Sequence, residues 1–164
     1  MSQESEIIRF YSTGDEYGGF SNFAAAPFSV KGRRWPTSEH YFQAQKFAGT
    51  PREEEIRRVR SPAIAARMGR SRKHRLRPDW EKVKDAVMRA AVLAKFRQND
   101  DLRALLLSTG EAILIEHTER DAYWGDGGDG SGRNRLGEIL MSVRAELRRA
   151  ETNEAKTGSD KPAI

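Results

Sequence analysis

The sequence predicts a single compact α+β domain that is mainly α-helical and has a few short strands. A chain of 164 residues has the usual length of one domain with its own hydrophobic core. Apolar residues recur at helical spacing in the two longest patterned segments, 79–98 and 136–147. β-branched and aromatic residues gather only in short runs, which is typical of short strands.

Three stretches of the chain are predicted to be extended. Residues 7–11 form a β-branched and aromatic run, so we expect a strand there and a loop over 12–19. Residues 28–35 carry a Lys-Gly pair at their centre and predict a hairpin or two short extended pieces. Residues 112–115 predict a further short strand.

Helices are expected to dominate the rest of the chain. The first is expected to start at Thr37 or Ser38, either of which can cap it, and to run to about Ala48. Pro51 can occupy the first turn of the second helix. Three consecutive glutamates follow that proline, and their charge favours the positive N-terminal end of the helix.

The later helices are predicted from caps and apolar spacing. A third helix is expected from the Ser-Pro pair at 61–62 to about Gly69, and the longest covers 79–98. Residues 102–107 continue the helical pattern. The last helix has Asn134 as a good N-cap. One face of it carries an apolar stripe made of Leu136, Ile139, Leu140, Val143 and Leu147.

The only composition shift along the chain lies near its C-terminal end. Residues 150–164 are polar and nearly free of large apolar side chains. Such a segment cannot bury enough apolar surface to offset the entropy of ordering it. We therefore expect a folded domain over residues 1–149 and a disordered polar tail over 150–164.

The positive charge of the chain is concentrated in its middle third. Lys and Arg number 29 against 24 Asp and Glu, a net charge of +5. Residues 52–103 hold 16 basic and 8 acidic residues, a local +8, which leaves −3 for the rest. Residues 67–77 contain six basic residues and no acidic one. This run fits a phosphate-binding surface, and it equally fits a solvated helix end followed by a basic loop.

Composition excludes several kinds of chemistry. The chain has no cysteine, so it has no disulfide, no thiolate nucleophile and no Cys-ligated metal. Its three histidines, at 40, 74 and 117, match no zinc motif, so we predict neither a metal nor a cofactor. No apolar stretch approaches the roughly 20 residues of a membrane span, and the first residues do not resemble an export signal. We therefore expect a cytoplasmic protein with no membrane partner.

Residues 35–47, WPTSEHYFQAQKF, form the first candidate site. On a helix, Glu39, Gln43 and Lys46 share one stripe because they are spaced at i, i+4 and i+7. A carboxylate, an amide and an ammonium in one line could hold a polar substrate and exchange protons with it. The alternative is an exposed face on which these side chains are merely solvated.

Two further segments combine aromatic, glycine and polar residues. Residues 116–137, EHTERDAYWGDGGDGSGRNRLG, hold five glycines and two aspartates over 125–132, directly before a predicted helix. Glycine N–H groups at a helix start favour an anion, although a Gly-rich turn whose aspartates bond their own backbone fits as well. Residues 10–23, FYSTGDEYGGFSNF, suit a loop that lines a pocket or an aromatic part of the core.

Taken together, these three segments resemble the NADAR family of N-glycosidases, in its bacterial YbiA type. The resemblance covers roughly residues 8–148 and includes the segment SPAIAARMGR and the surroundings of Trp80. It implies hydrolysis of the N-glycosidic bond of early riboflavin-pathway intermediates, which are aminopyrimidine ribosyl 5-phosphates, with release of ribose 5-phosphate. Removal of ADP-ribose from guanine bases of nucleic acid is the alternative activity. A non-catalytic module that binds ADP-ribose or nucleic acid is a third possibility.

The resemblance also implies roles for individual residues. Glu39 is expected to stabilise the sugar cation at C1 or to activate water. Lys46 offers a covalent route, because its amine could attack C1 and form a Schiff base with the opened ribose. Asp126 or Asp129 is expected to protonate the leaving ring or to hold the ribose hydroxyls.

Substrate binding is expected to involve a second set of side chains. Trp124, together with Trp80 or Tyr11, is expected to stack on the heterocycle. Asn22 is expected to bond the polar edge of the ring. Gln43 and the phosphate ligands Arg133 and Asn134 complete the predicted binding residues, which are Tyr11, Asn22, Gln43, Trp80, Trp124, Arg133 and Asn134.

Overall fold

The computed structural model describes residues 4–159 of the chain. The order of elements confirms the predicted fold class, mainly α-helical with a few short strands. The elements are β1 (Ile7–Phe10), the 3-10 helix η1 (Gly18–Phe20), β2 (Phe28–Val30), β3 (Arg33–Trp35), α1 (Ser38–Gln45), α2 (Pro51–Arg58), α3 (Pro62–Arg70), α4 (Trp80–Gln98), α5 (Asp100–Ser108), β4 (Ile113–Glu116) and α6 (Arg135–Ser159).

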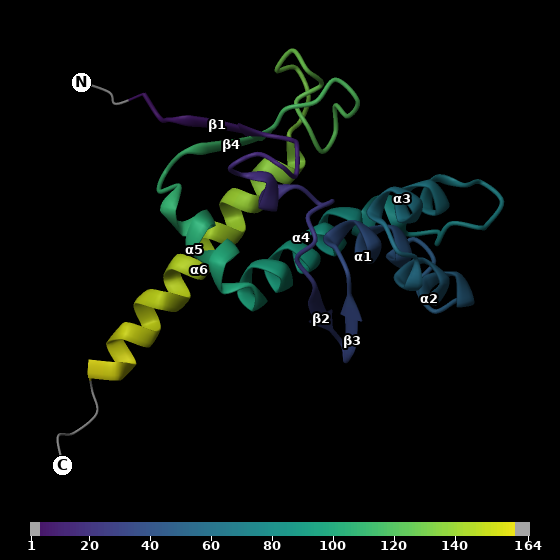
Figure 1. Cartoon of the computed structure of the whole chain (residues 1–164), viewed down its shortest axis with the longest axis horizontal. Helices are drawn as coiled ribbons and strands as arrows, with labels where there is room; N and C mark the ends of the chain where they lie inside the picture. The colour runs from purple at the N-terminus through teal and green to yellow at the C-terminus, as the bar shows by residue number, and fades with distance from the viewer. Residues whose placement is uncertain (1–3, 160–164) are drawn as a thin grey trace.

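Helix α4 forms the centre of the molecule and separates two hydrophobic clusters. The larger cluster joins β1, β4, α4, α5 and α6, and the smaller one joins the β2–β3 hairpin to α1, α2 and α3. Figure 1 shows α1, α2 and α3 at one end of the molecule and the β1–β4 pair with α6 at the other. The two halves therefore share one central helix.

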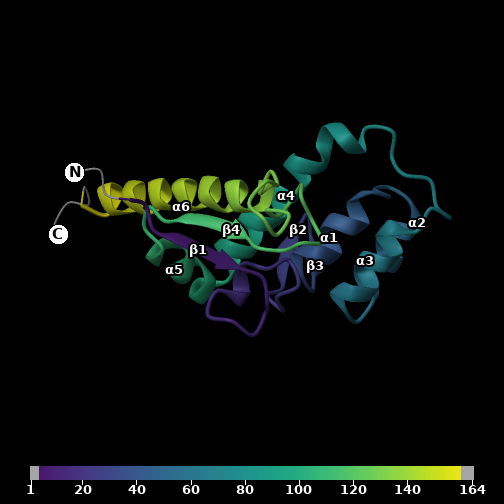
Figure 2. The same cartoon turned by 90° about the horizontal axis from the view of Figure 1, so that it is seen from above.

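Strands β1 and β4 form a parallel pair in which Ile7 lies opposite Ile113 and Phe10 lies opposite Glu116. Helix α6 runs beside β4 and packs on it (Figure 2). Because the strands are parallel, their carboxyl ends meet at the same edge. The long loop between β4 and α6 lies at that edge (Figure 1). In parallel sheets this is the edge where ligands usually bind.

The short elements follow from the predicted turn and cap residues. The hairpin turn between β2 and β3 holds Lys31 and Gly32, both with positive φ. Thr37 caps α1, and its hydroxyl accepts the N–H of His40 at 3.1 Å. Ser61 caps α3 in the same way. The predicted starts of these helices are therefore confirmed, whereas α1 already ends at Gln45 rather than Ala48.

The expected disordered tail is wrong for residues 150–159. Helix α6 continues to Ser159, although every side chain over 151–158 is exposed. Glu, Ala and Lys are good helix formers, so this extension needs no apolar face once the preceding turns are packed. Residues 160–164 of the expected tail lie outside the described residues. Among the described helices, none is long and apolar enough to cross a membrane.

Candidate active site

Glu39 lies in the first turn of α1, a helix that is buried around its whole circumference. Glu39 is 7% exposed, and Gln43, one turn later, is 3% exposed. The N–H of Glu39 donates to the carbonyl of Asn22 at 3.1 Å, which ties the start of α1 to the preceding loop. The alternative of a merely solvated face is therefore wrong for Glu39 and Gln43, which lie inside the protein, whereas Lys46 is partly exposed.

Gln43 orients the carboxylate of Glu39. Its Nε2 donates to Oε1 of Glu39 at 2.8 Å, whereas its own Oε1 is buried without a hydrogen-bond partner. Helix α3 crosses so closely that a Cβ added to Gly69 would lie 2.0 Å from that oxygen. Only glycine fits at this crossing, so the packing of α3 on α1 fixes the amide that holds Glu39.

The pKa of Glu39 is raised because burial disfavours its charged form. The hydrogen bond from Gln43 and the positive charges of Arg70 and Lys46 act in the opposite direction. The negative charge of Asp121 adds to the rise. Glu39 is therefore a desolvated carboxyl with two cations nearby, a setting suited to stabilising positive charge or to accepting a proton.

Lys46 caps the C-terminal end of α1, and its ammonium lies against aromatic rings. Its Nζ is 3.4 Å from the carbonyl oxygen of Gly69 and 5.8 and 5.9 Å from the ring centres of Phe42 and Trp80. Burial lowers the pKa of Lys46, and the negative charge of Glu39 opposes this shift. A lysine that loses its proton more readily is a stronger nucleophile.

Phe42 joins the two predicted stacking tryptophans into one aromatic wall. The centre of its ring lies 5.0 Å from that of Trp80 and 5.3 Å from that of Trp124. Trp80 is 5% exposed, so it is packed into this wall. Trp124 is partly exposed, which leaves surface for a substrate ring. Of the two, Trp124 is the better stacking platform.

The Gly-rich segment 125–132 is held by its own hydrogen bonds. Three of its glycine N–H groups donate to oxygens of Asp121 and Asp126, and the N–H groups of 133–136 donate to carbonyls of 122–125. Positive φ angles at three of its glycines permit this folding. These N–H groups are already paired, so phosphate binding by the other N–H groups of the segment stays a prediction.

Asp126 and Asp129 accept hydrogen bonds within this loop. Asp126 is bonded by Nδ1 of His117 at 2.8 Å and by two backbone N–H groups, and Asp129 by the N–H and the hydroxyl of Ser131. Burial raises the pKa of Asp126, but these bonds, led by that of His117, bring it below its usual value. The bonds from Ser131 lower the pKa of Asp129. A carboxylate with a lowered pKa donates a proton poorly, so their contacts disfavour the predicted acid role.

The predicted phosphate ligands Arg133 and Asn134 have different surroundings. The guanidinium of Arg133 is exposed and lies 5.1 Å from the ring centre of Tyr123. Asn134 donates through Nδ2 to the carbonyl of Leu114 at 2.9 Å and accepts the N–H of Glu116 at 3.0 Å. The side chain of Asn134 thus joins β4 to α6 and does not cap the helix as predicted, nor is it free to bind phosphate.

Asn22 and Tyr11 have different surroundings. Oδ1 of Asn22 accepts the hydroxyl of Ser38 at 2.8 Å, and its Nδ2 lies 3.4 Å from the sulfur of Met88. These contacts hold the start of α1, and the role of Asn22 at the edge of a heterocycle stays a prediction. Tyr11 is exposed and lines a surface depression of about 410 Å³ with residues 117–120.

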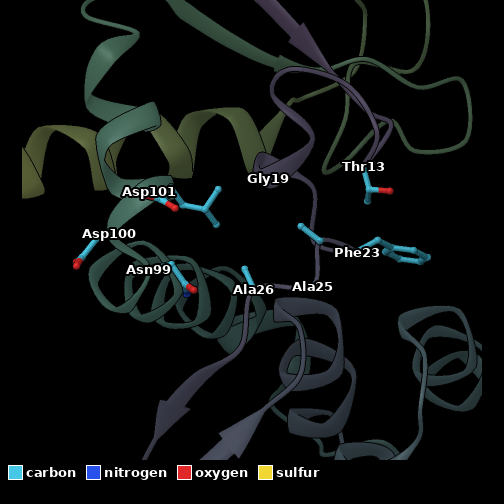
Figure 3. A pocket seen from close by; sticks show the side chains of 10 residues that line it. Thr13, Gly19, Phe23, Ala25, Ala26, Asn99, Asp100 and Asp101 are labelled. Atoms are coloured by element: carbon cyan, nitrogen blue, oxygen red, sulfur yellow. The ribbon is translucent and has the colours of Figure 1, made fainter.

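A larger depression, of about 580 Å³, contains none of the predicted site residues. It lies between the loop around Phe23 and the start of α5 (Figure 3). Asp100 and Asp101 stand on one side of it, and Phe23 points away from them. The rest of its lining consists mostly of small side chains. This depression therefore holds no group that could act together with Glu39.

Sequence reasoning missed two carboxylates beside Glu39. Glu116 ends β4, and Asp121 follows in the loop, where its Oδ1 accepts the N–H groups of Tyr123 and Trp124. The negative charges of Asp121 and Glu39 raise the pKa of Glu116, and that of Asp121 also raises the pKa of Glu39. The position of Glu116 at the carboxyl end of a strand could have signalled it, but only if the parallel pairing with β1 had been known.

The basic run 67–77 does not form one uniform surface. Arg70, at the end of α3, acts electrostatically on both Glu39 and Lys46. Arg77 instead pairs with Asp79 at 2.6 Å. Residues 72–75 are exposed. Over residues 4–159 there is no group of three or more His, Cys, Asp or Glu side chains arranged to hold a metal ion.

Comparison with known proteins gives consistent results. Residues 9–148 match the model of the NADAR domain family. N-glycosidase YbiA of Escherichia coli (strain K12) is 63% identical over 144 residues, which cover 88% of this chain and 90% of that protein. The riboflavin biosynthesis protein VVA0006 of Vibrio vulnificus is 46% identical over 85% of this chain, which spans 38% of that protein. The NMR structure of Escherichia coli YbiA superimposes with a TM-score of 0.85 at 60% identity, covering 92% of this chain and 90% of that one.

Proposed function

The chain belongs to the NADAR family and is an N-glycosidase, and from this premise we propose that its substrate is an aminopyrimidine ribosyl 5-phosphate. Cleavage would release ribose 5-phosphate and the free aminopyrimidine. The names of the relatives support this choice, because N-glycosidases and a riboflavin biosynthesis protein match the same region. The resemblance predicted from three sequence segments is thereby confirmed at the level of the family.

One observation carries the proposal for the site. Buried Glu39 and partly exposed Lys46, at the start and the C-cap of α1, influence each other's pKa, and Lys46 lies over the ring of Phe42, which contacts the partly exposed ring of Trp124. Cleavage of an N-glycoside builds positive charge at C1, which a nearby carboxylate stabilises. If the base of the substrate stacks on Trp124, Glu39 and Lys46 would both lie on the same side of its ribose.

Two routes use these groups. In the first, Glu39 takes a proton from water as the water oxygen bonds to C1 and the bond to the base breaks. In the second, the Lys46 amine bonds to C1, the base leaves, and the opened ribose remains as a Schiff base until water releases it. The exposed guanidiniums of Arg133 and Arg70 are candidates to bind the phosphate of the substrate.

Replacement of Glu39 by Gln keeps the size of the side chain and removes its charge. We expect Glu39→Gln to lower kcat for release of ribose 5-phosphate by roughly 10²- to 10⁴-fold, the usual contribution of a general base. Glu151→Gln, a change of the same kind on the exposed end of α6, is the control. Wild-type turnover by Glu39→Gln would remove Glu39 from the mechanism. Borohydride added during turnover decides between the routes, since only the lysine route leaves an adduct on Lys46.

A second candidate substrate is nucleic acid that carries ADP-ribose on guanine. The observation that favours it is the exposed basic stretch 72–75, which follows directly on Arg70 at the site. Parallel assays decide between the two: one measures ribose 5-phosphate released from the pyrimidine, the other ADP-ribose released from modified DNA. Binding of both substrates without turnover of either would instead support the non-catalytic module.

A further inference from the structure

Lys95, on α4, is a buried cation that the proposed reaction does not use. It is 1% exposed, and within residues 4–159 no carboxylate forms an ion pair with it. Its ammonium donates to the carbonyl oxygen of Ser21 at 2.8 Å and lies 5.4 Å from the ring centre of Phe96. A buried charge without a partner of opposite charge costs free energy that a methionine of similar length would avoid. What the ammonium contributes is thus its contact with Ser21.

The carbonyl of Ser21 also opens a tight turn over residues 21–24, because it accepts the N–H of Ala24 at 3.1 Å. Asn22, the second residue of this turn, contacts α4 as well, since its Nδ2 lies 3.4 Å from the sulfur of Met88. Ser21 and Asn22 are only 7% and 8% exposed. Helix α4 therefore holds the buried start of the turn at two points, through an ammonium and through a sulfur.

The first turn of α1 is bonded to this 21–24 turn. The N–H groups at the start of a helix find no partner within the helix. The N–H of His40 donates to the side chain of the N-cap residue, at the same helix end. That of Glu39 donates instead to the carbonyl of Asn22 at 3.1 Å, and the hydroxyl of Ser38 donates to Oδ1 of Asn22 at 2.8 Å. The 21–24 turn therefore fixes the backbone of Glu39.

We propose that Lys95 is a positioning residue for Glu39, because by binding the carbonyl of Ser21 it fixes the turn to which the start of α1 is bonded. The proposal rests on the catalytic role of Glu39 proposed above. Three links connect the two side chains: the 2.8 Å bond to Ser21, the peptide between Ser21 and Asn22, and the 3.1 Å bond from the N–H of Glu39. A displacement of about 1 Å is enough to slow a reaction about 10²-fold, so this anchoring affects the rate although Lys95 is not a reacting group.

The test combines Lys95→Met with a matched control on the same helix. Methionine has a similar length but no hydrogen-bond donor, so we expect Lys95→Met to lower kcat by roughly 10- to 10²-fold and to leave KM within about twofold of its value. Gln98→Met is the control, because exposed Gln98 binds the backbone of Ser29, beyond the turn, through two hydrogen bonds. Its kcat is expected to be unchanged. A raised KM with unchanged kcat in Lys95→Met would mean that the turn serves Asn22 and not Glu39, which contradicts the proposal.

A double-mutant cycle separates positioning from a general structural role. If Lys95 acts through the carboxylate of Glu39, Lys95→Met lowers kcat in the wild-type background and causes no further loss once Glu39 is replaced by Gln. A merely structural defect lowers kcat by the same factor in both backgrounds, and that result would overturn the proposal. Urea unfolding of each variant verifies that it is folded under the conditions of the assay.

Amide hydrogen exchange needs no turnover and separates this proposal from that of the mechanism. In Lys95→Met the N–H of Glu39 is expected to exchange roughly tenfold faster, a factor that corresponds to the loss of about one hydrogen bond. The N–H of His40, bonded within its own helix end, should keep its rate. Wild-type turnover by Glu39→Gln would refute the catalytic role of Glu39, while the exchange rates still show whether Lys95 holds it. Equal acceleration at both amides, or at neither, refutes the anchoring by Lys95 whatever the mechanism.

Discussion

Gly69 lies where α3 crosses α1, and its missing side chain makes room for Gln43. A Cβ there would come within 2.0 Å of Oε1 and 2.8 Å of Cβ of Gln43. The amide that holds Glu39 would have to move. A residue without any functional group of its own thereby determines the position of a catalytic carboxylate, and a sequence pattern shows it only as a helix residue.

Replacement of Gly69 by alanine tests this dependence. We expect Gly69→Ala to lower the free energy of unfolding by roughly 1 to 3 kcal/mol through overpacking, and to reduce kcat as Glu39 loses its partner. Gly158→Ala is the control, because a Cβ at this helical position meets no atom within 4 Å. Urea unfolding and an activity assay measure both effects. Unchanged kcat in Gly69→Ala would show that Gln43 does not position Glu39.

Lys95 is a buried lysine whose Nζ donates to the carbonyl of Ser21 at 2.8 Å. It is 1% exposed, and burial lowers its pKa to about 7. Below that pH the folded and unfolded states both carry the proton, and the folded state bears the full cost of a buried charge. Between about pH 7 and the ordinary pKa of lysine, the unfolded state binds more protons than the folded state. The free energy of unfolding therefore rises with pH in this range.

Lys95→Met is expected to remove this pH dependence. Between about pH 7 and pH 9, the free energy of unfolding of the wild type should rise by roughly 2 kcal/mol relative to that of Lys95→Met. Lys82→Met, on the exposed side of the same helix, is the control. Chemical denaturation at both pH values measures the gap. A gap independent of pH would mean that Lys95 titrates at its ordinary value inside the protein.

At the scale of the element, α1 shows what a local pattern cannot reveal. Its polar stripe of Glu39, Gln43 and Lys46 is the kind that normally faces water, and its opposite side carries Tyr41 and Ala44. In the structure α2, α3 and α4 enclose it, so both sides are buried. A helix that is enclosed around its circumference can hold charged groups in a dry site, which is where they perform chemistry best.

Helix α6 shows the opposite case, an ordered element with no packing at its end. Its last buried side chain is Leu147, and residues 151–158 are exposed. A chain that stops after Arg149 should therefore unfold with a free energy within roughly 0.5 kcal/mol of the full chain and keep its kcat. Circular dichroism and urea unfolding measure this. A marked loss of stability would show that the exposed turns support the fold.

At the scale of the whole molecule, Arg70 connects the basic part of the chain with the site around Glu39. The basic excess lies in the middle third of the sequence, and most of the predicted site residues lie outside it. Folding places the end of α3 beside α1, so one residue of the basic run acts on Glu39 and Lys46. The remaining exposed cations at 72–75 extend the positive potential outward, which would attract a phosphorylated substrate.

The sequence by itself determined the helices, the short strands, the family and the central role expected of the segment around Glu39, because caps, periodicity and motifs are local. It did not determine which polar groups remain free. The predicted phosphate cradle, the acid role of Asp126 and the ring contact of Asn22 were inferred from residue types and from the family resemblance. Each of these groups is used by hydrogen bonds within the fold. Only the tertiary structure decided this, because a hydrogen-bond partner distant in sequence is known only once the chain has folded, and the same holds for the charges of Arg70 and Asp121 that act on Glu39.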